Sequence, residues 1–461
     1  MIKALGRRRR GITAAVSLVG VSTLAVGMAA PAGANTPVAP ANPLVMGSGS
    51  NTTYSMMSAL SALFNSAPGC DQLVASGTQQ LNFSCASPPD SPPPGGENGY
   101  SLTYPSVNPF NAVVYQMPAY GSSNGIKQLE FSGSDTLSGV SLSEPSFARS
   151  SRAAKVSASG DKSGLNFVAY AEDAVPWFTY TKVNGKATPQ SKIKKLNLTV
   201  SQLAGIYNGT TTNWSLVGGS SAPIDVFMAQ NGSGTEGTWV ADLGLTGAYP
   251  YGGATATATA TGLPVSDFEI FENEVSQIFA TGLESDAIFF FSYGKYSLLC
   301  PKGLCAGVPA KDGKGVTINA KTTVAALGEI GGITASATTI QNGTFPLDRE
   351  LYNVYSDGKN ANLPPVNLDA QNFISTYGFL CNPQTTTEVD PLSPSGATYR
   401  TEIDNIISAN GFFPIPEGTM GDAHVTPPNF GSVPLYAQAD PPPPNDQGFC
   451  QVTTTDGDTN N

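Results

Sequence analysis

The chain has 461 residues, of which 40% are hydrophobic and 12% charged, so it is long enough for two or three domains with a buried core. Its formal net charge of −11 excludes nucleic acid as an expected partner and means that an anionic ligand would have to be bound by local donors. With one histidine, His424, and no closely spaced cysteine pair of the CxxC kind, we expect neither a metal site nor a cofactor.

The N-terminus has the pattern of a secretory signal peptide over residues 1–34. Arg7 to Arg10 form a basic region, residues 11–30 are apolar and small, and Ala32-Gly33-Ala34 is a cleavage site of small residues. A membrane anchor is the alternative, which the Gly, Ser and Thr content and the cleavage pattern disfavour. Cleavage near Ala34 leaves 18 Lys and Arg against 34 Asp and Glu, a net charge of −16. We expect a secreted, extracytoplasmic protein without a lipid anchor, because no cysteine lies near the cleavage site.

All six cysteines lie in the exported part, which favours disulfides in an oxidising compartment. Pairing of neighbours is one of the connectivities that six cysteines allow. It gives Cys70–Cys85, Cys300–Cys305 and Cys381–Cys450.

Three segments share a pattern of strand, small-residue turn and helix. After a Pro-rich linker at 35–43 comes LVMGSGSNTTYSMMSALSALF (44–64), with Met57, Leu60, Leu63 and Phe64 at helical spacing. The second is AVVYQMPAYGSSNGIKQL (112–129), and the third is PIDVFMAQNGSGTEGTWVADLGL (223–245). Between the first two, residues 67–110 are rich in Pro, Ser and Gly and predict a surface insertion.

The remaining segments alternate between strands and helices. Residues 165–181 predict buried sheet, and a helix follows from Thr199, with Gln202 completing a capping box and Asn208-Gly209 ending it. ATATATAT (254–261) predicts a loop or edge segment, while DAIFFFSYGKYSLL (286–299) and FPLDRELYNVYS (345–356) predict strands. Helices are predicted at 369–377 and 399–409, and a disordered acidic tail from about 417. The alternation indicates an α/β fold with parallel strands.

The three turns are the best candidates for chemistry. In open α/β sheets ligands bind beyond the carboxyl ends of the strands, where these turns fall. A helix start offers unpaired N–H groups and partial positive charge, and Ser and Thr add hydroxyl donors. Together they predict an anion site.

The order of these segments resembles that of the periplasmic phosphate-binding proteins of ABC transporters, the PstS-like proteins. LTVSQLAGIYNGTTTNW, NGSGT, DAIFFFSYGKYS, FPLDRELYNVYS, GSGSNTT and YGSSNGIKQ carry the resemblance, which runs from about Val45 to Pro416. It implies a two-lobed type II periplasmic-binding-protein fold, with a hinge and a central cleft that closes on the ligand. We assign 44–166 to the first lobe, 167–343 to the second, 344–416 to the return to the first, and 417–461 to the tail.

The resemblance implies a set of ligand-binding residues. The first turn would contribute Ser50, Asn51 and Thr52, the second Ser122 and Ser123, and the third Ser233, Gly234 and Thr235. The family usually has an Arg three residues before the first Gly of GSGT, sometimes with an Asp beside it, or an Arg directly after GSGT. Here these positions are Ala229, Asn231 and Glu236, and we expect Glu236 to face solvent.

The missing positive charge then has to come from elsewhere. SFARSSRAAK (146–155) is similar to a strand end in actinobacterial members, and in the family this region supplies an acceptor for the proton of phosphate. Here the matching position is near Ser151, and Arg149 or Arg152 would bind the oxyanion bidentately; alternatively both are surface charges. A different alignment makes Asp135 the acceptor.

Two other functions compete with a phosphate receptor. GSSNG (121–125) fits the G-x-S-x-G pattern of a hydrolase, with Ser123 as nucleophile, but the only imidazole is His424, in a Pro-rich stretch. Asp422 or Asp404 would orient it. A secreted domain that kept the fold and lost the ligand, serving in adhesion or sensing, is the other alternative. We expect a monomeric binding protein for phosphate or another small oxyanion, with an ABC permease as its partner and no catalytic activity.

Overall fold

The computed structural model describes residues 44–66, 74–76, 101–103, 113–117, 119–130, 135–137, 140–142, 145–155, 160–245, 267–299, 311–358, 360–365, 367–375, 378–381, 383–387, 389–390, 393–415 and 450–454. Among these residues no helix has the length and apolar character that a membrane crossing requires. The predicted signal peptide, the linker, most of the insertion, the segment 254–261, His424, Asp422 and the cysteines Cys70, Cys85, Cys300 and Cys305 lie outside the described residues.

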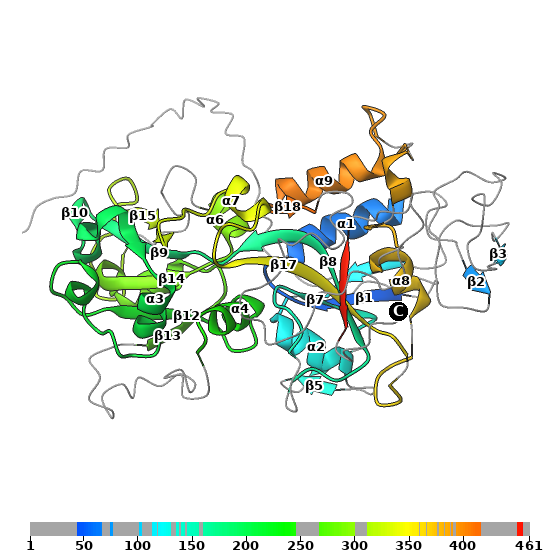
Figure 1. Cartoon of the computed structure of the whole chain (residues 1–461), viewed down its shortest axis with the longest axis horizontal. Coiled ribbons are helices and arrows are strands. Elements are labelled where there is room, and N and C mark those ends of the chain that lie inside the picture. Colours follow the sequence, from blue (N-terminus) through cyan, green and yellow to red (C-terminus); the bar gives the residue numbers. More distant parts are fainter. Residues whose placement is uncertain are drawn as a thin grey trace, which may run out of the picture. The chain divides into compact units, whose positions relative to one another are not determined.

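A large mixed sheet forms the first of two α/β units (Figure 1), with strand order β18-β8-β17-β7-β1-β4 and β19 paired with β8. Its strands are β1 (Leu44–Gly49), β4 (Val113–Gln116), β7 (Phe147–Ser150), β8 (Leu165–Ala174), β17 (Asp348–Ser356), β18 (Phe413–Pro414) and β19 (Gln451–Thr454). β1 runs parallel to β4 and β7, whereas β17 is antiparallel to β7 and β8. The parallel strands therefore bring the ends of β1 and β7, and the turns after them, to one edge of the sheet.

Helices cover both faces of this sheet. α1 (Tyr54–Ser66), α8 (Leu368–Ile374) and α9 (Tyr399–Ala409) pack in one apolar cluster, where Phe64 and Phe147 both contact the ring of Phe373. On the opposite face, α2 (Ser122–Glu130) buries Ile126 and Leu129 against a second cluster (Figure 1). This burial of apolar side chains on both sides is what fixes the turns at the helix starts.

The second unit is built on a sheet with strand order β10-β9-β14-β12-β13 and with β15 paired to β9. Its strands are β9 (Trp177–Val183), β10 (Lys186–Ala187), β12 (Asp225–Ala229), β13 (Asp267–Ile270), β14 (Ala287–Phe290) and β15 (Val324–Leu327). β12 is parallel to β13 and β14, so the loops after β12 and β13 lie side by side.

Helices also cover both faces of the second sheet. α3 (Val200–Tyr207), α4 (Gly234–Asp242) and α7 (Ala337–Gln341) pack on one face, where the Trp239 ring stacks on Phe290. α5 (Ser276–Thr281) packs on the other. β8 ends at Ala174 and β9 begins at Trp177, so the chain passes from one sheet to the other between them.

Shorter elements complete the described chain. The small two-stranded pairs are β2 (Val74–Ser76) with β3 (Ser101–Thr103), β5 (Asp135–Leu137) with β6 (Val140–Leu142), and β11 (Asn197–Leu198) with β16 (Glu329–Ile330). The remaining helices are α6 (Tyr293–Leu299) and the 3-10 turns η1 (Pro189–Lys192), η2 (Lys194–Leu196), η3 (Trp214–Val217), η5 (Glu284–Asp286) and η7 (Pro383–Thr386).

Most sequence expectations agree with this fold, and two differ. The α/β class is confirmed, as is the capping box in which Thr199 and Gln202 satisfy each other's N–H groups. The prediction of a strand over 286–299 is wrong after Phe290, because the chain turns there and continues as α6.

The end of the predicted tail also differs. Residues 451–454 form β19 beside β8, and the predicted disulfide Cys381–Cys450 is confirmed directly before it. That cross-link holds this segment against the first sheet, which composition alone did not indicate.

Candidate functional site

Four turns converge on one buried cluster of hydroxyl groups. The Ser50 hydroxyl donates to Ser151 Oγ at 3.2 Å, and Ser122 Oγ lies 3.3 Å from the same atom. Gly234 closes the cluster from the second unit, because a Cβ there would meet Ser122 Oγ and Ser151 Oγ at 2.2 and 2.3 Å. The three serines are fully buried. Residues predicted from separate turns thus lie together.

Three more hydroxyls surround the carboxylate of Glu272. Ser233 donates to its Oε2 at 2.7 Å, Thr235 donates to its Oε1 at 2.5 Å, and Thr52 also donates to Oε1. Thr52 and Thr235 hydroxyl oxygens are 3.3 Å apart. We call Thr52, Ser233 and Thr235 the hydroxyl cage; all three are fully buried, and Ser233 is the N-cap of α4.

A buried arginine reaches the cage from β17. Arg349 Nη1 donates to Thr235 Oγ1 at 3.0 Å and to the Ser151 carbonyl at 2.9 Å. Its other side faces Asp173 on β8, whose Oδ2 accepts from Nη2 at 2.7 Å and from Nε at 3.1 Å. Asp173 in turn accepts from the Gly294 amide at 3.0 Å. Arg349 therefore brings the cage a positive charge that a buried carboxylate holds in place.

The two arginines predicted from FARSSR are engaged elsewhere. Arg149 is fully buried, and its guanidinium donates to the carbonyls of Gly47, Gly49, Ser50 and Met117 and to Gln116 Oε1. Burial lowers the pKa of Arg149 to about 10, so that it stays cationic at neutral pH. These contacts tie the turn after β1 to its neighbours.

Arg152 is paired with a carboxylate. Its Nη1 and Nη2 donate to Asp161 at 2.8 and 2.7 Å, and its Nε donates to Ser123 Oγ at 3.0 Å. Ser123 is thus hydrogen-bonded to a guanidinium, which cannot act as a general base. Asp404, the second acid considered for a hydrolase, pairs with Arg400 on α9.

The other candidate residues lie at the margin. Asn51 is half-buried in the turn before α1. Asp135 is in β5, which pairs with β6 apart from the two large sheets, and its side chain is outside the described residues. Glu236 is half-buried, which differs from the solvent-facing position we expected; burial raises the pKa of its carboxyl, and the nearby Lys155 partly opposes that rise.

Sequence reasoning missed Arg349, Asp173 and Glu272. Arg349 and Asp173 lie opposite each other on β17 and β8, in the two segments 345–356 and 165–181 that the sequence predicts as strands. Charged residues inside otherwise buried strands were the available signal, because buried charges are usually paired. Glu272 follows β13 in a segment without a recognisable motif, so no such signal existed for it.

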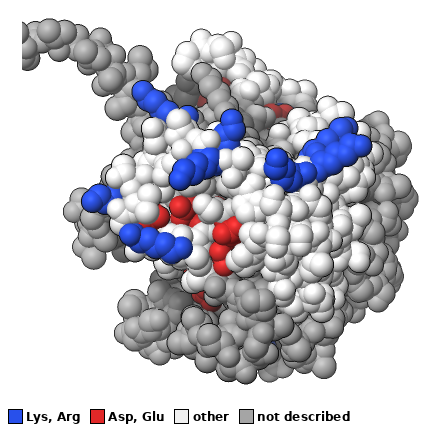
Figure 2. Space-filling view, turned by 90° about the vertical axis from the view of Figure 1, so that its left-hand side faces the viewer, with Lys and Arg blue, Asp and Glu red and all other residues white. Residues whose placement is uncertain are grey.

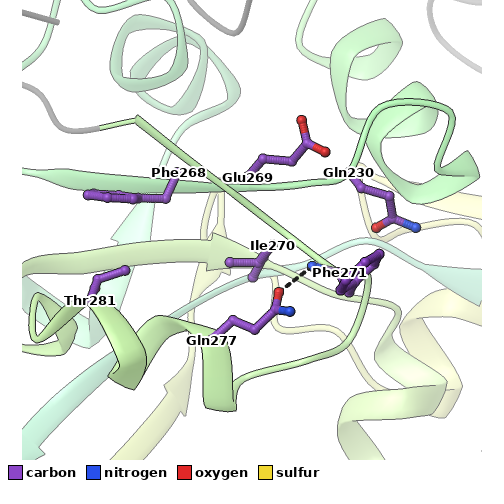
Figure 3. A pocket seen from close by; sticks show the side chains of 7 residues that line it. All are labelled: Gln230, Phe268, Glu269, Ile270, Phe271, Gln277 and Thr281. Carbon is purple, nitrogen blue, oxygen red and sulfur yellow. Dashed lines mark hydrogen bonds between the residues drawn. The ribbon is translucent and has the colours of Figure 1, made fainter. Parts of the chain in front are cut away.

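A separate pocket of about 180 Å³ lies beside the cage (Figure 3). Phe268 and Phe271 lie at its two ends, and Gln277 hydrogen-bonds to the Phe271 amide at 2.6 Å. Gln230, which also lines it, accepts from the Glu272 amide at 2.6 Å. Within the described ranges, no group of three or more His, Cys, Asp or Glu residues is arranged to hold a metal ion.

A family model for the PBP superfamily domain matches residues 108–375, more than half of the chain. The chain therefore belongs to the PBP superfamily, and its family and fold are those of solute-binding proteins. No curated protein matches it.

Three solved structures that match this chain are 17% or 18% identical to it. A putative phosphate ABC transporter substrate-binding protein with bound phosphate from Clostridium perfringens is 18% identical, covering 81% of this chain and 100% of its own, with a TM-score of 0.39. An ABC-type phosphate transport receptor from Vibrio cholerae is 18% identical, covering 80% and 99%, with a TM-score of 0.42. PstS from Borrelia burgdorferi is 17% identical, covering 81% and 100%, with a TM-score of 0.37.

Proposed function

We propose that this chain is an extracytoplasmic solute-binding protein that binds a small tetrahedral oxyanion, with phosphate as the first ligand to test, for uptake by an ABC permease. The observation that carries the proposal is the convergence of buried hydroxyls from both α/β units on the start of α4, with Arg349 beside them. Membership of a solute-binding family supports it.

The chemistry of these groups suits an oxyanion. Thr52, Ser233 and Thr235 present hydroxyl donors, and the first turn of α4 adds main-chain N–H groups and the positive end of the helix dipole. Arg349 supplies the formal charge. Because the donors belong to both units, binding an anion between them would favour the conformation in which the units meet.

Calorimetry on the mature chain tests the proposal. The protein is purified with unfolding and refolding to remove carried ligand, and titrated with phosphate and, separately, with sulfate. Micromolar or tighter binding of phosphate without binding of sulfate is expected. Failure of both anions to bind would reject the proposal.

Further features belong to the same proposal. We propose that the chain is a monomer, that residues 1–34 are removed on export, and that its nearest relatives are actinobacterial. The lobe boundaries predicted from the sequence and the ligand contacts of Asn51, Ser122 and Ser151 stay part of the same proposal.

The second candidate is a secreted domain that no longer binds phosphate. The specific observation in its favour is that Glu272, a carboxylate of the chain itself, already accepts hydrogen bonds from the cage. The same titration separates the two candidates.

A further inference from the structure

Glu272 is bound by the cage as a ligand would be. Its two carboxylate oxygens share three buried hydroxyls: Oε1 accepts from Thr52 and Thr235, and Oε2 accepts from Ser233. These donors come from two different turns and from both units. A carboxylate and a phosphate both present oxygens that carry negative charge, so the same donors suit either group.

The backbone around Glu272 holds the side chain in this place. Its amide donates to Gln230 Oε1 at 2.6 Å, and the next residue, Asn273, has a φ of +66°. A positive φ is uncommon for residues other than glycine, although Asn adopts it more readily than most. Phe271, which precedes Glu272 in the chain, and Gln230, which contacts its amide, both line the pocket of Figure 3. Open space therefore lies next to this loop.

Charged side chains of both signs lie around the cage. Arg349 pairs with Asp173, and Lys295 interacts electrostatically with both Asp173 and Glu272. An oxyanion added beside Glu272 would bring excess negative charge into a buried site, whereas an oxyanion that takes the place of Glu272 would not.

We propose that Glu272 is an internal competitor, whose carboxylate occupies the oxyanion subsite and has to leave before an external anion binds. This inference rests on the proposed function. Glu272 then sets the affinity of the site for an external anion. The binding free energy of the anion is only the difference between its own interactions with the cage and those that Glu272 gives up.

The test compares Glu272→Gln with Glu269→Gln by phosphate calorimetry. Glu269 is exposed on the neighbouring strand β13, so its substitution removes the same charge without altering the cage. Wild type and Glu269→Gln are expected to bind alike, and Glu272→Gln to bind phosphate at least about tenfold more tightly, as loss of a charged competitor in a buried site predicts. Glu272→Ala, which removes all cage contacts of the side chain, is expected to behave as Glu272→Gln does.

Each outcome decides the question. Tighter binding by both Glu272 variants supports the inference. Unchanged affinity overturns it while leaving the proposed function intact, as long as the wild type binds phosphate. Weaker binding overturns it as well, because Glu272 would then contact the anion and not compete with it. Absence of binding in all four proteins overturns both the inference and the proposed function, and circular dichroism confirms that each variant is folded.

Discussion

Arg349 is the cation whose contacts fit an oxyanion site. Arg149 donates to main-chain carbonyls and Arg152 to Asp161, so either would have to give up buried hydrogen bonds to reach a ligand. Arg349 already touches Thr235 at the start of α4, while Asp173 holds the rest of its guanidinium. We therefore propose that the positive charge of the oxyanion site comes from Arg349 on β17.

Substitution of Arg349 tests that assignment. We expect Arg349→Gln to weaken phosphate binding by about tenfold or more, since hydrogen bonds to a charged partner contribute about 1.5–3 kcal/mol. Arg152→Gln should change the affinity by less than about threefold, because Arg152 pairs with Asp161 and donates no hydrogen bond to the cage. Both affinities are measured by calorimetry.

A double variant separates the loss of the Arg349 charge from a loss of folding stability. Arg349→Gln alone leaves Asp173 buried without its partner, which destabilises the fold. Asp173→Asn/Arg349→Gln removes both charges and is expected to bind phosphate as weakly as the single variant. If the double variant binds like wild type, the cation that matters is not Arg349.

The sequence indicated hydroxyl residues that the structure brings together, but it did not indicate Arg349. Small residues at the starts of helices follow from local rules, so Thr52, Ser122, Ser233 and Thr235 were predicted and do lie in the converging turns. Which arginine lies in the candidate site depends on how strands that are far apart in the sequence pair with each other. The distance along the chain from Arg349 to Thr235 is 114 residues, and no local pattern reports that contact.

At the scale of elements, β8 and β17 carry carboxyl groups in an unusual arrangement. Glu172 on β8 lies directly opposite Glu350 on β17, and Asp348 is two residues before Glu350 on β17. Burial, and then the nearby Glu350 and Asp348, raise the pKa of Glu172 to about 8. Burial, and then Glu350, raise the pKa of Asp348 to about 7.

These raised pKa values predict that the fold loses stability as pH rises. Between the ordinary carboxyl pKa near 4 and the folded values of about 7 and 8, the native state binds more protons than the unfolded state. The free energy of unfolding should therefore fall from pH 5 to pH 8. Urea denaturation across this range measures it, and Glu172→Gln should flatten the slope. A rise in stability over the same range would contradict the burial of these groups.

The fold was predictable where a rule acts over a few residues. Three repeats of strand, turn and helix, and the capping box at Thr199, gave the α/β class and most helix starts. The turn into α6 and the strand β19 were not predicted. FFFSYGKYSLL is apolar enough for either a strand or a helix, and β19 depends on a disulfide that joins positions 69 residues apart.

At the scale of the whole molecule, the net charge opposes the proposed ligand. The chain carries −11, and an anion approaching it meets repulsion that extends over a Debye length of about 30 Å at 0.01 M salt and about 8 Å at 0.15 M. Figure 2 nevertheless shows one face on which Lys and Arg gather in several groups around fewer Asp and Glu. Exposed lysines in the described chain include Lys182, Lys186, Lys192, Lys194 and Lys195.

The salt dependence of the phosphate association rate shows whether the net negative charge or the exposed lysines dominate the electrostatic force on the approaching anion. If the net charge dominates, added sodium chloride screens repulsion, and the association rate constant should rise by roughly twofold or more between 0.01 and 0.15 M. Stopped-flow fluorescence measures it, because Trp239 on α4 lies buried four residues beyond Thr235. A rate constant that falls with salt would mean that groups of exposed lysines attract the anion in spite of the net charge. In that case Glu272 would oppose binding only after the anion has met the protein.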